Sequence, residues 1–136
     1  MKISESITIF SIFLAVVLIV AAGFVFQRAR PEISRTYLTP QEVKSLIDEN
    51  RDLVVVDISP YFYAKGHLPG ALNYPKCALS SVIMGLDRDK TYLIYCHGFG
   101  SPMFGADKLK EAGFKNVYTL LGNYGAWVDA GYPIEN

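Results

Sequence analysis

The sequence predicts an α/β domain, with a mostly parallel sheet and helices on both faces, preceded by one transmembrane helix. A long uncharged apolar run near the start of the chain predicts the membrane helix. Behind it, short runs rich in β-branched residues alternate with segments of helical periodicity, which predicts the parallel sheet. A cysteine and a glycine-containing loop follow one of those runs. Ligands bind at the carboxyl ends of parallel strands, so this loop is the first candidate for a functional site.

The composition excludes several classes of function. The chain has 136 residues, enough for one domain, and its formal net charge is zero. No block of like charge occurs, which argues against nucleic acid as a partner. Two cysteines are too few for a disulfide framework, and they lack the spacing of zinc ligands. No metal or organic cofactor is implied.

The N-terminal run, Ile7–Phe26, contains no charged residue. As a helix it would extend over roughly 30 Å, the thickness of a hydrocarbon core. We therefore expect a membrane anchor over residues 1–27, a linker over 28–35 and the α/β domain over 36–136. A cleaved signal peptide is the alternative, with residues 20–22 as the cleavage site, but the apolar run continues beyond that point.

The charges beside this run give its expected orientation. Lys2 precedes it, whereas Arg28, Arg30 and Arg35 follow it. The positive-inside rule then predicts a single-pass protein of the cell membrane with its domain in the cytoplasm. The charge difference is small, and exported anchored domains also begin with a short N-terminus of this kind, so the opposite side stays the alternative.

The first element of the domain is a helix that begins at Thr39. Thr39 is placed to cap it, Pro40 suits its first turn and Glu42 is placed to complete a capping box. Asn50 is its expected end. The continuous apolar run Leu53–Asp57 then predicts a strand that is buried on both faces.

The remaining elements follow in the same alternation. They are a short helix from Ser59 through Ala64, a strand over 71–74, a strand over 91–95, a helix from Ser101 to Gly113, a strand over 116–120 and a last helical segment over 124–130.

The loop at Cys96 carries the strongest chemical signal. Cys96 directly follows the strand over 91–95, and a helix begins at Ser101. Gly98 and Gly100 can adopt positive φ, which lets the loop curl and turns successive backbone N–H groups inward. With the helix N-terminus, these donors would stabilise the thiolate of Cys96, one extra sulfur atom on it, or a substrate oxyanion. The alternative is a buried cysteine that serves as a small apolar residue.

Several segments together resemble rhodanese-like domains, over the range from about Tyr37 to the C-terminus. The resemblance is carried, in the family's order, by Val56-Asp57-Ile58, by Tyr-Ala-Lys-Gly-His-Leu-Pro-Gly-Ala (63–71), by the loop at Cys96, by Lys-Glu-Ala-Gly-Phe-Lys-Asn-Val-Tyr (110–118) and by Gly-Ala-Trp-Val-Asp-Ala-Gly-Tyr-Pro (125–133).

This resemblance implies a single-domain sulfurtransferase. Its cysteine takes a sulfane sulfur from thiosulfate or a persulfide, and passes it to cyanide or a thiol. Cys96 matches the nucleophile. The backbone amides of the loop match the persulfide cradle, which consists of His97, Gly98, Phe99, Gly100 and Ser101. Positions that are mostly structural in the family are matched by Asp57, His67 and Trp127.

Three positions depart from the family's pattern. Arginines that are common in active members are replaced by Ser59, His97 and Ser101. Each replacement removes a bidentate clamp for an oxyanion, so we expect thiosulfate to bind poorly and a persulfide donor to remain suitable. Phosphatases of this fold need an arginine where Pro102 stands, which argues against phosphatase activity.

Two other functions stay open. The lost arginines favour a catalytically weak module that docks a protein partner at the membrane, while the retained Cys96 argues against it. A thiol redox protein using Cys77 with Cys96 is disfavoured because no Cys-x-x-Cys motif occurs. Cys77 is interpreted as a small packing residue.

Four aromatic and imidazole side chains are candidates for the surroundings of Cys96. His97 either favours the thiolate when protonated or lies at the rim of the pocket. Phe99, with Tyr61 and Phe62, is a candidate for an apolar wall of the pocket.

Overall fold

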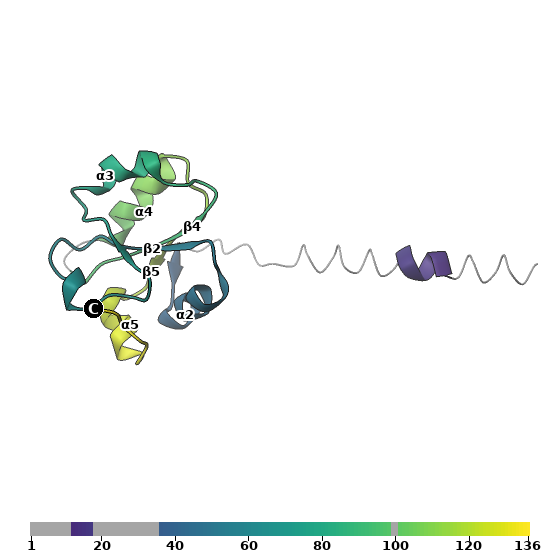
Figure 1. Cartoon of the computed structure of the whole chain (residues 1–136), viewed down its shortest axis with the longest axis horizontal. Helices are drawn as coiled ribbons and strands as arrows, with labels where there is room; N and C mark the ends of the chain where they lie inside the picture. The colour runs from purple at the N-terminus through teal and green to yellow at the C-terminus, as the bar shows by residue number, and fades with distance from the viewer. Residues whose placement is uncertain (1–11, 18–35, 99–100) are drawn as a thin grey trace, which may run out of the picture. The chain divides into compact units, whose positions relative to one another are not determined.

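The computed structural model describes residues 12–17, 36–98 and 101–136 (Figure 1). The chain divides into two compact units, Met1–Ser34 and Arg35–Asn136. In the first unit residues 12–17 are helical. Among the described residues, no helix combines the length and the apolar character that crossing a membrane requires. Most of the predicted span Ile7–Phe26 lies outside the described residues, so the anchor stays a prediction.

Within the described part of the second unit, five strands form one sheet in the order β1-β5-β4-β2-β3. They are β1 (Tyr37–Leu38), β2 (Leu53–Asp57), β3 (Leu72–Asn73), β4 (Thr91–Tyr95) and β5 (Val117–Leu120). Every strand pair is parallel, which confirms the predicted sheet. Asp57 is in register with Tyr95, so the carboxyl ends of β2 and β4 lie side by side.

Helices cover both faces of this sheet, as the sequence predicts (Figure 1). One face carries α2 (Pro40–Glu49) and α5 (Asn123–Asp129), and the other carries α3 (Leu79–Val82) and α4 (Pro102–Glu111). Two short 3₁₀ helices, η1 (Tyr63–Lys65) and η2 (Ile83–Gly85), complete the unit as described.

The helix α2 begins at the predicted capping box. The backbone N–H of Thr39 donates to Glu42 Oε2 at 2.8 Å, and the N–H of Glu42 donates to Thr39 Oγ1 at 3.3 Å. Pro40 occupies the first turn, and Asn50 is the C-cap residue. These contacts satisfy N–H groups that would otherwise have no partner at a helix start, a stabilisation of about 1 kcal/mol.

Two apolar clusters form the core, one on each face of the sheet. Along β2, Val56 belongs to the cluster under α3 and α4, whereas Val55 belongs to the cluster under α2 and α5. Along β4, Ile94 and Leu93 divide in the same way. Among the described residues, all members of both clusters belong to 36–136, so this unit builds its core without the described residues of the first unit.

Some boundaries differ from the predicted ones. The helix expected from Ser59 through Ala64 is reduced to η1, and its first residues belong to the site described below. The sequence predicts neither β1 nor α3 with η2, because elements of two to four residues are too short to show a hydrophobic period. Ser101 does stand at the N-cap of α4, but its side chain makes no capping hydrogen bond.

Candidate active site

Cys96 lies at the end of β4 and is 2% exposed. Its carbonyl oxygen accepts a hydrogen bond from the backbone N–H of Tyr124, at the start of α5, at 3.0 Å. Next to it, the backbone N–H of Ile58 donates to the carbonyl of Tyr95 at 3.0 Å, so the β2–β4 pairing continues to the edge of the site. The sulfur is therefore held in a fixed position where two neighbouring strands end.

The hydroxyl of Ser59 is placed to donate to the sulfur of Cys96. The distance from Ser59 Oγ to Cys96 Sγ is 3.8 Å, within hydrogen-bond range for sulfur. The backbone N–H of His97 donates to the same Oγ at 2.9 Å. Because that oxygen already accepts a bond from His97, its own proton is free to point at Sγ, and this contact stabilises a thiolate.

Asp57 and His97 form a buried pair beside the cysteine. His97 Nε2 lies 3.1 Å from Asp57 Oδ2, with the carboxylate 0% exposed and the imidazole side chain 8% exposed. The other carboxylate oxygen, Oδ1, accepts the backbone N–H of Ser59 at 2.7 Å. Both oxygens of Asp57 therefore have partners, as a buried carboxylate requires. The interpretation of His97 as an exposed rim residue is wrong, because burial and this pairing hold it inside the site.

Aromatic rings surround the imidazole of His97. The ring of Tyr124 stacks on it with centroids 3.9 Å apart, and that of Phe62 lies nearly parallel to it at 5.8 Å. Of the predicted apolar wall, Phe62 is thus near the site, whereas Tyr61 is 82% exposed. Phe99 lies outside the described residues.

Two tyrosines near Asp57 stay neutral at physiological pH. Burial raises the pKa of Tyr95 far above its ordinary value, and the negative charge of Asp57 adds to the rise. Burial also raises the pKa of Tyr124, again with a contribution from Asp57. Neither phenol can act as a base here, and the hydroxyl of Tyr95 instead accepts the backbone N–H of Leu68 at 3.1 Å.

The described part of the loop is consistent with the geometry that the sequence predicts. Gly98 has φ of +111°, a conformation that favours glycine over residues with a side chain. Gly100 and Phe99 lie outside the described residues, so their part in a persulfide cradle stays a prediction. Ser101 is exposed at the start of α4.

His67 and Trp127 lie away from the sulfur in buried positions. His67 Nδ1 is 3.1 Å from the carbonyl oxygen of Tyr63, and the two rings stack at 3.9 Å. The indole N–H of Trp127 donates to the carbonyl of Pro133 at 2.8 Å. Both residues hold the C-terminal segment in place, because His67 Nε2 also lies 3.8 Å from Glu135 Oε2 and the backbones of His67 and Glu135 form a bridge.

The sequence did not predict the contact that Ser59 makes, nor the position of Tyr124. Ser59 stands two residues after Asp57, and only the register of β2 against β4 brings it to Cys96. The signal that could have indicated this contact is the position of Ser59, a polar residue just beyond the buried strand β2. No pattern in the sequence points to Tyr124, which reaches the site from α5.

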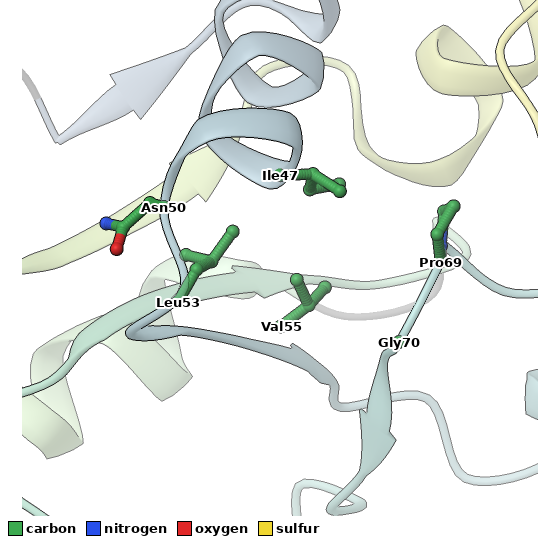
Figure 2. Close-up of a pocket in the computed structure, with 6 residues that line it drawn as sticks. All are labelled: Ile47, Asn50, Leu53, Val55, Pro69 and Gly70. Atoms are coloured by element: carbon green, nitrogen blue, oxygen red, sulfur yellow. The ribbon is translucent and has the colours of Figure 1, made fainter.

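Other features of the described residues do not form a catalytic centre. A cavity of about 300 Å³ between α2, β2 and the turn at Pro69 contains no nucleophile (Figure 2). It is lined by Ile47, Asn50, Leu53, Val55, Pro69 and Gly70. No cluster of three or more possible metal ligands occurs among the residues described. Cys77 is an exposed free thiol, so its interpretation as a packing residue is wrong.

Comparisons with known proteins find relatives of this chain. The pattern of the rhodanese-like domain matches residues 39–130. A thiosulfate sulfurtransferase GlpE from Pseudomonas entomophila is 33% identical over 99 residues, which covers 72% of this chain and 88% of that protein. Another, from Coxiella burnetii, is 35% identical over 81 residues, covering 58% of this chain and 75% of that protein.

Solved structures share the fold. One from Rhodopseudomonas palustris, described as a protein of unknown function and possible tyrosine phosphatase, is 29% identical with a TM-score of 0.64. The match covers 75% of this chain and 86% of that one. The family match, over residues 39–130, falls on the unit that holds Cys96.

Proposed function

Because the chain belongs to the family of rhodanese-like domains, we propose that it is a sulfurtransferase that carries sulfane sulfur as a persulfide on Cys96. The observation that carries the proposal is the contact between the Ser59 hydroxyl and the Cys96 sulfur. A buried cysteine with a hydroxyl donor on its sulfur is prepared to hold the negative charge of the thiolate, which is the nucleophile when sulfur is taken up and the leaving group when sulfur is passed on.

The reaction has two displacement steps. In the first, the Cys96 thiolate attacks the outer sulfur of a persulfide donor. The donor's S–S bond breaks, its thiolate leaves with the electron pair, and a Cys96 persulfide forms. In the second, an acceptor thiolate attacks the terminal sulfur, and the thiolate of Cys96 is restored. Each S–S bond formed replaces one that is broken, so no external oxidant is needed.

We propose a persulfide as the preferred donor in place of thiosulfate. Three positions where related enzymes carry arginine hold Ser59, His97 and Ser101 here. Ser59 offers one neutral donor, and the imidazole of His97 is engaged with Asp57. The dianion thiosulfate loses its bidentate partners at these positions, whereas the single charge of a persulfide needs less compensation.

Intact-mass measurement of residues 36–136 tests this proposal. After incubation with a low-molecular-weight persulfide we expect a gain of one sulfur, about 32 Da. The gain should persist in Cys77→Ser and disappear in Cys96→Ser, and thiosulfate should give less of it. If a folded protein with a free Cys96 thiol gains sulfur from neither donor, the sulfur-carrier function is wrong.

That negative result would favour a docking module, the second candidate, which the replaced arginines support.

Phosphatase activity is a separate question, raised by the description of the R. palustris relative. Pro102, at the first turn of α4, cannot hold phosphoryl oxygens as an arginine would. We therefore expect no hydrolysis of an aryl phosphate by the wild-type chain.

We also propose that residues 1–27 anchor the protein in the cell membrane, with the domain on the cytoplasmic side. The uncharged run Ile7–Phe26 and the arginines after it support this proposal. The full chain should stay in the membrane fraction after alkaline carbonate washing, whereas residues 36–136 should be washed out. Protease added outside intact cells should leave the domain intact. Release by carbonate, or a mature N-terminus near Gly23, would contradict the anchor.

A further inference from the structure

A second cavity, of about 400 Å³, is lined by segments that are connected to the Cys96 site. It is lined by Pro60, Lys76, Cys77 and Phe104. Pro60 directly follows Ser59, whose hydroxyl contacts the Cys96 sulfur. The backbone N–H of Lys76 donates to the carbonyl of Ile58 at 3.1 Å, so this wall is attached to the end of β2.

The opposite wall belongs to the helix that follows the Cys96 loop. The backbone N–H of Phe104 donates to the carbonyl of Ser101, the last residue of that loop, at 3.0 Å. The cavity therefore lies between the two segments that lead to the reactive sulfur, one after β2 and one at the start of α4.

The lining combines an apolar surface with one available positive charge. Lys76 Nζ lies over the ring of Phe104, 4.3 Å from its centroid, a cation–π contact that orients the ammonium group. Lys108 also approaches this ring, at 6.0 Å, but its ammonium is paired with Glu111 at 2.9 Å. Within the described residues, Lys76 has no carboxylate in ion-pair range, so its charge is available to a ligand.

We propose that this cavity binds the carboxylate-bearing skeleton of a small aliphatic persulfide, the sulfur donor. This inference rests on the proposed function and specifies its substrate class. The carboxylate pairs with Lys76, the methylene groups lie against Pro60 and Phe104, and the persulfide extends toward Cys96. The donor's carboxylate thus binds at Lys76, at the opposite end of the donor from the transferred sulfur. Recognition of the donor then does not depend on arginines around Cys96. A volume of this size is typical of small-ligand sites.

Binding can be measured without any reaction by using thioethers, which carry no transferable sulfur. Residues 36–136, labelled with ¹⁵N, are titrated with 3-(methylthio)propionate and with the neutral 3-(methylthio)propan-1-ol. We expect amide shifts at Lys76, Cys77 and Phe104, and at least fivefold tighter binding of the carboxylate. In Lys76→Gln that preference should fall below twofold. Lys115→Gln, which removes an exposed lysine that does not line the cavity, should leave it unchanged.

Kinetics with persulfide donors give the second measurement. In Lys76→Gln, the KM for the persulfide of 3-mercaptopropionate should rise about five- to tenfold, with kcat and the KM for the persulfide of 2-mercaptoethanol unchanged. Equal binding of the two thioethers to wild type, or a preference that survives Lys76→Gln, would overturn the subsite while leaving Cys96 as a sulfur carrier. If wild type prefers the carboxylate thioether through Lys76 but Cys96 gains no sulfur, the subsite stands and the proposed function is wrong.

Discussion

At the scale of single residues, this site differs from the family's pattern mainly at Ser59. A neutral hydroxyl stands there in place of the guanidinium that is common in the family. Ser59 receives the N–H of His97 and contacts the sulfur of Cys96. Asp57 holds both of these residues, through the backbone of Ser59 and the ring of His97. The four residues therefore form one network, in which each contact fixes the geometry of the next.

Ser59→Ala should weaken the stabilisation of the Cys96 thiolate. A hydrogen bond to a charged group contributes about 1.5–3 kcal/mol, so we expect sulfur transfer to slow by roughly 10- to 100-fold. The rate of Cys96 alkylation by iodoacetamide, measured at a fixed neutral pH in a Cys77→Ser background, should fall. Ser81→Ala, which removes an exposed hydroxyl, is the matched control. An unchanged alkylation rate would show that the Ser59 contact does not affect the thiolate.

His97→Ala should destabilise the domain strongly, because it leaves Asp57 buried without its ring partner. Breaking a buried pair from one side costs about 3–5 kcal/mol. Adding Asp57→Asn removes the unpaired charge, so the double variant should be more stable than His97→Ala alone. Urea unfolding of the two single variants and the double variant measures the coupling. Additive losses would mean that the pair is not coupled.

The sequence predicts some elements better than others. Elements that are stabilised by their own local sequence are predicted well, and those that depend on tertiary contacts are not. The helix α2 carries its own capping box, and the buried runs of β2 and β4 have the length and composition of parallel strands, so local sequence is enough. By contrast, β1 and α3 are held by tertiary contacts, such as the burial of Leu38 and Leu79.

The site also has one part that the sequence predicts and one part that it does not. Cys96 and its glycine loop are visible in the sequence, whereas the Ser59 contact depends on strand register.

The packing of α4 on β4 gives a prediction at the scale of elements. A Cβ added at Gly105 would lie 2.8 Å from Ile94 Cγ2, whereas one at Gly125 in α5 meets nothing within 4 Å. Gly105→Ala should therefore overpack the α4 interface and destabilise the domain by about 1–3 kcal/mol. Gly125→Ala should be neutral or stabilising by up to about 1 kcal/mol, because alanine is the better helix former. Thermal unfolding of the two variants tests this difference, and equal melting temperatures would contradict it.

At the scale of the whole molecule, a sheet buried on both faces encloses ionisable phenols in its core. Burial raises the pKa of Tyr95 and of Tyr92 above the ordinary value. In the folded state Tyr95 keeps its proton at a pH where the unfolded chain loses it. Its contribution to stability is thus complete below the unfolded pKa of about 10 and is lost as pH rises above that value.

The free energy of unfolding should therefore fall above about pH 10, by up to about 1.4 kcal/mol per pH unit for Tyr95 alone. Urea titrations of residues 36–136 between pH 8 and pH 11 measure this fall. Tyr95→Phe should be less stable than wild type at pH 8, because Leu68 loses its hydrogen-bond acceptor, yet its stability should decline less steeply above pH 10. A wild-type stability that stays level through pH 11 would contradict the prediction.

The position of β1 at the edge of the sheet has a mechanical consequence. The chain enters the domain through this two-residue strand, which is held to β5 by bonds from Thr119 to Thr36 at 2.7 Å and from Leu121 to Leu38 at 2.8 Å. Tension applied to the N-terminal side would load these bonds first. Peeling β1 away would leave β4 between its neighbours β5 and β2, with Cys96 still in place. A pull from the N-terminal side would thus be absorbed at the margin of the sheet, before it could displace Cys96.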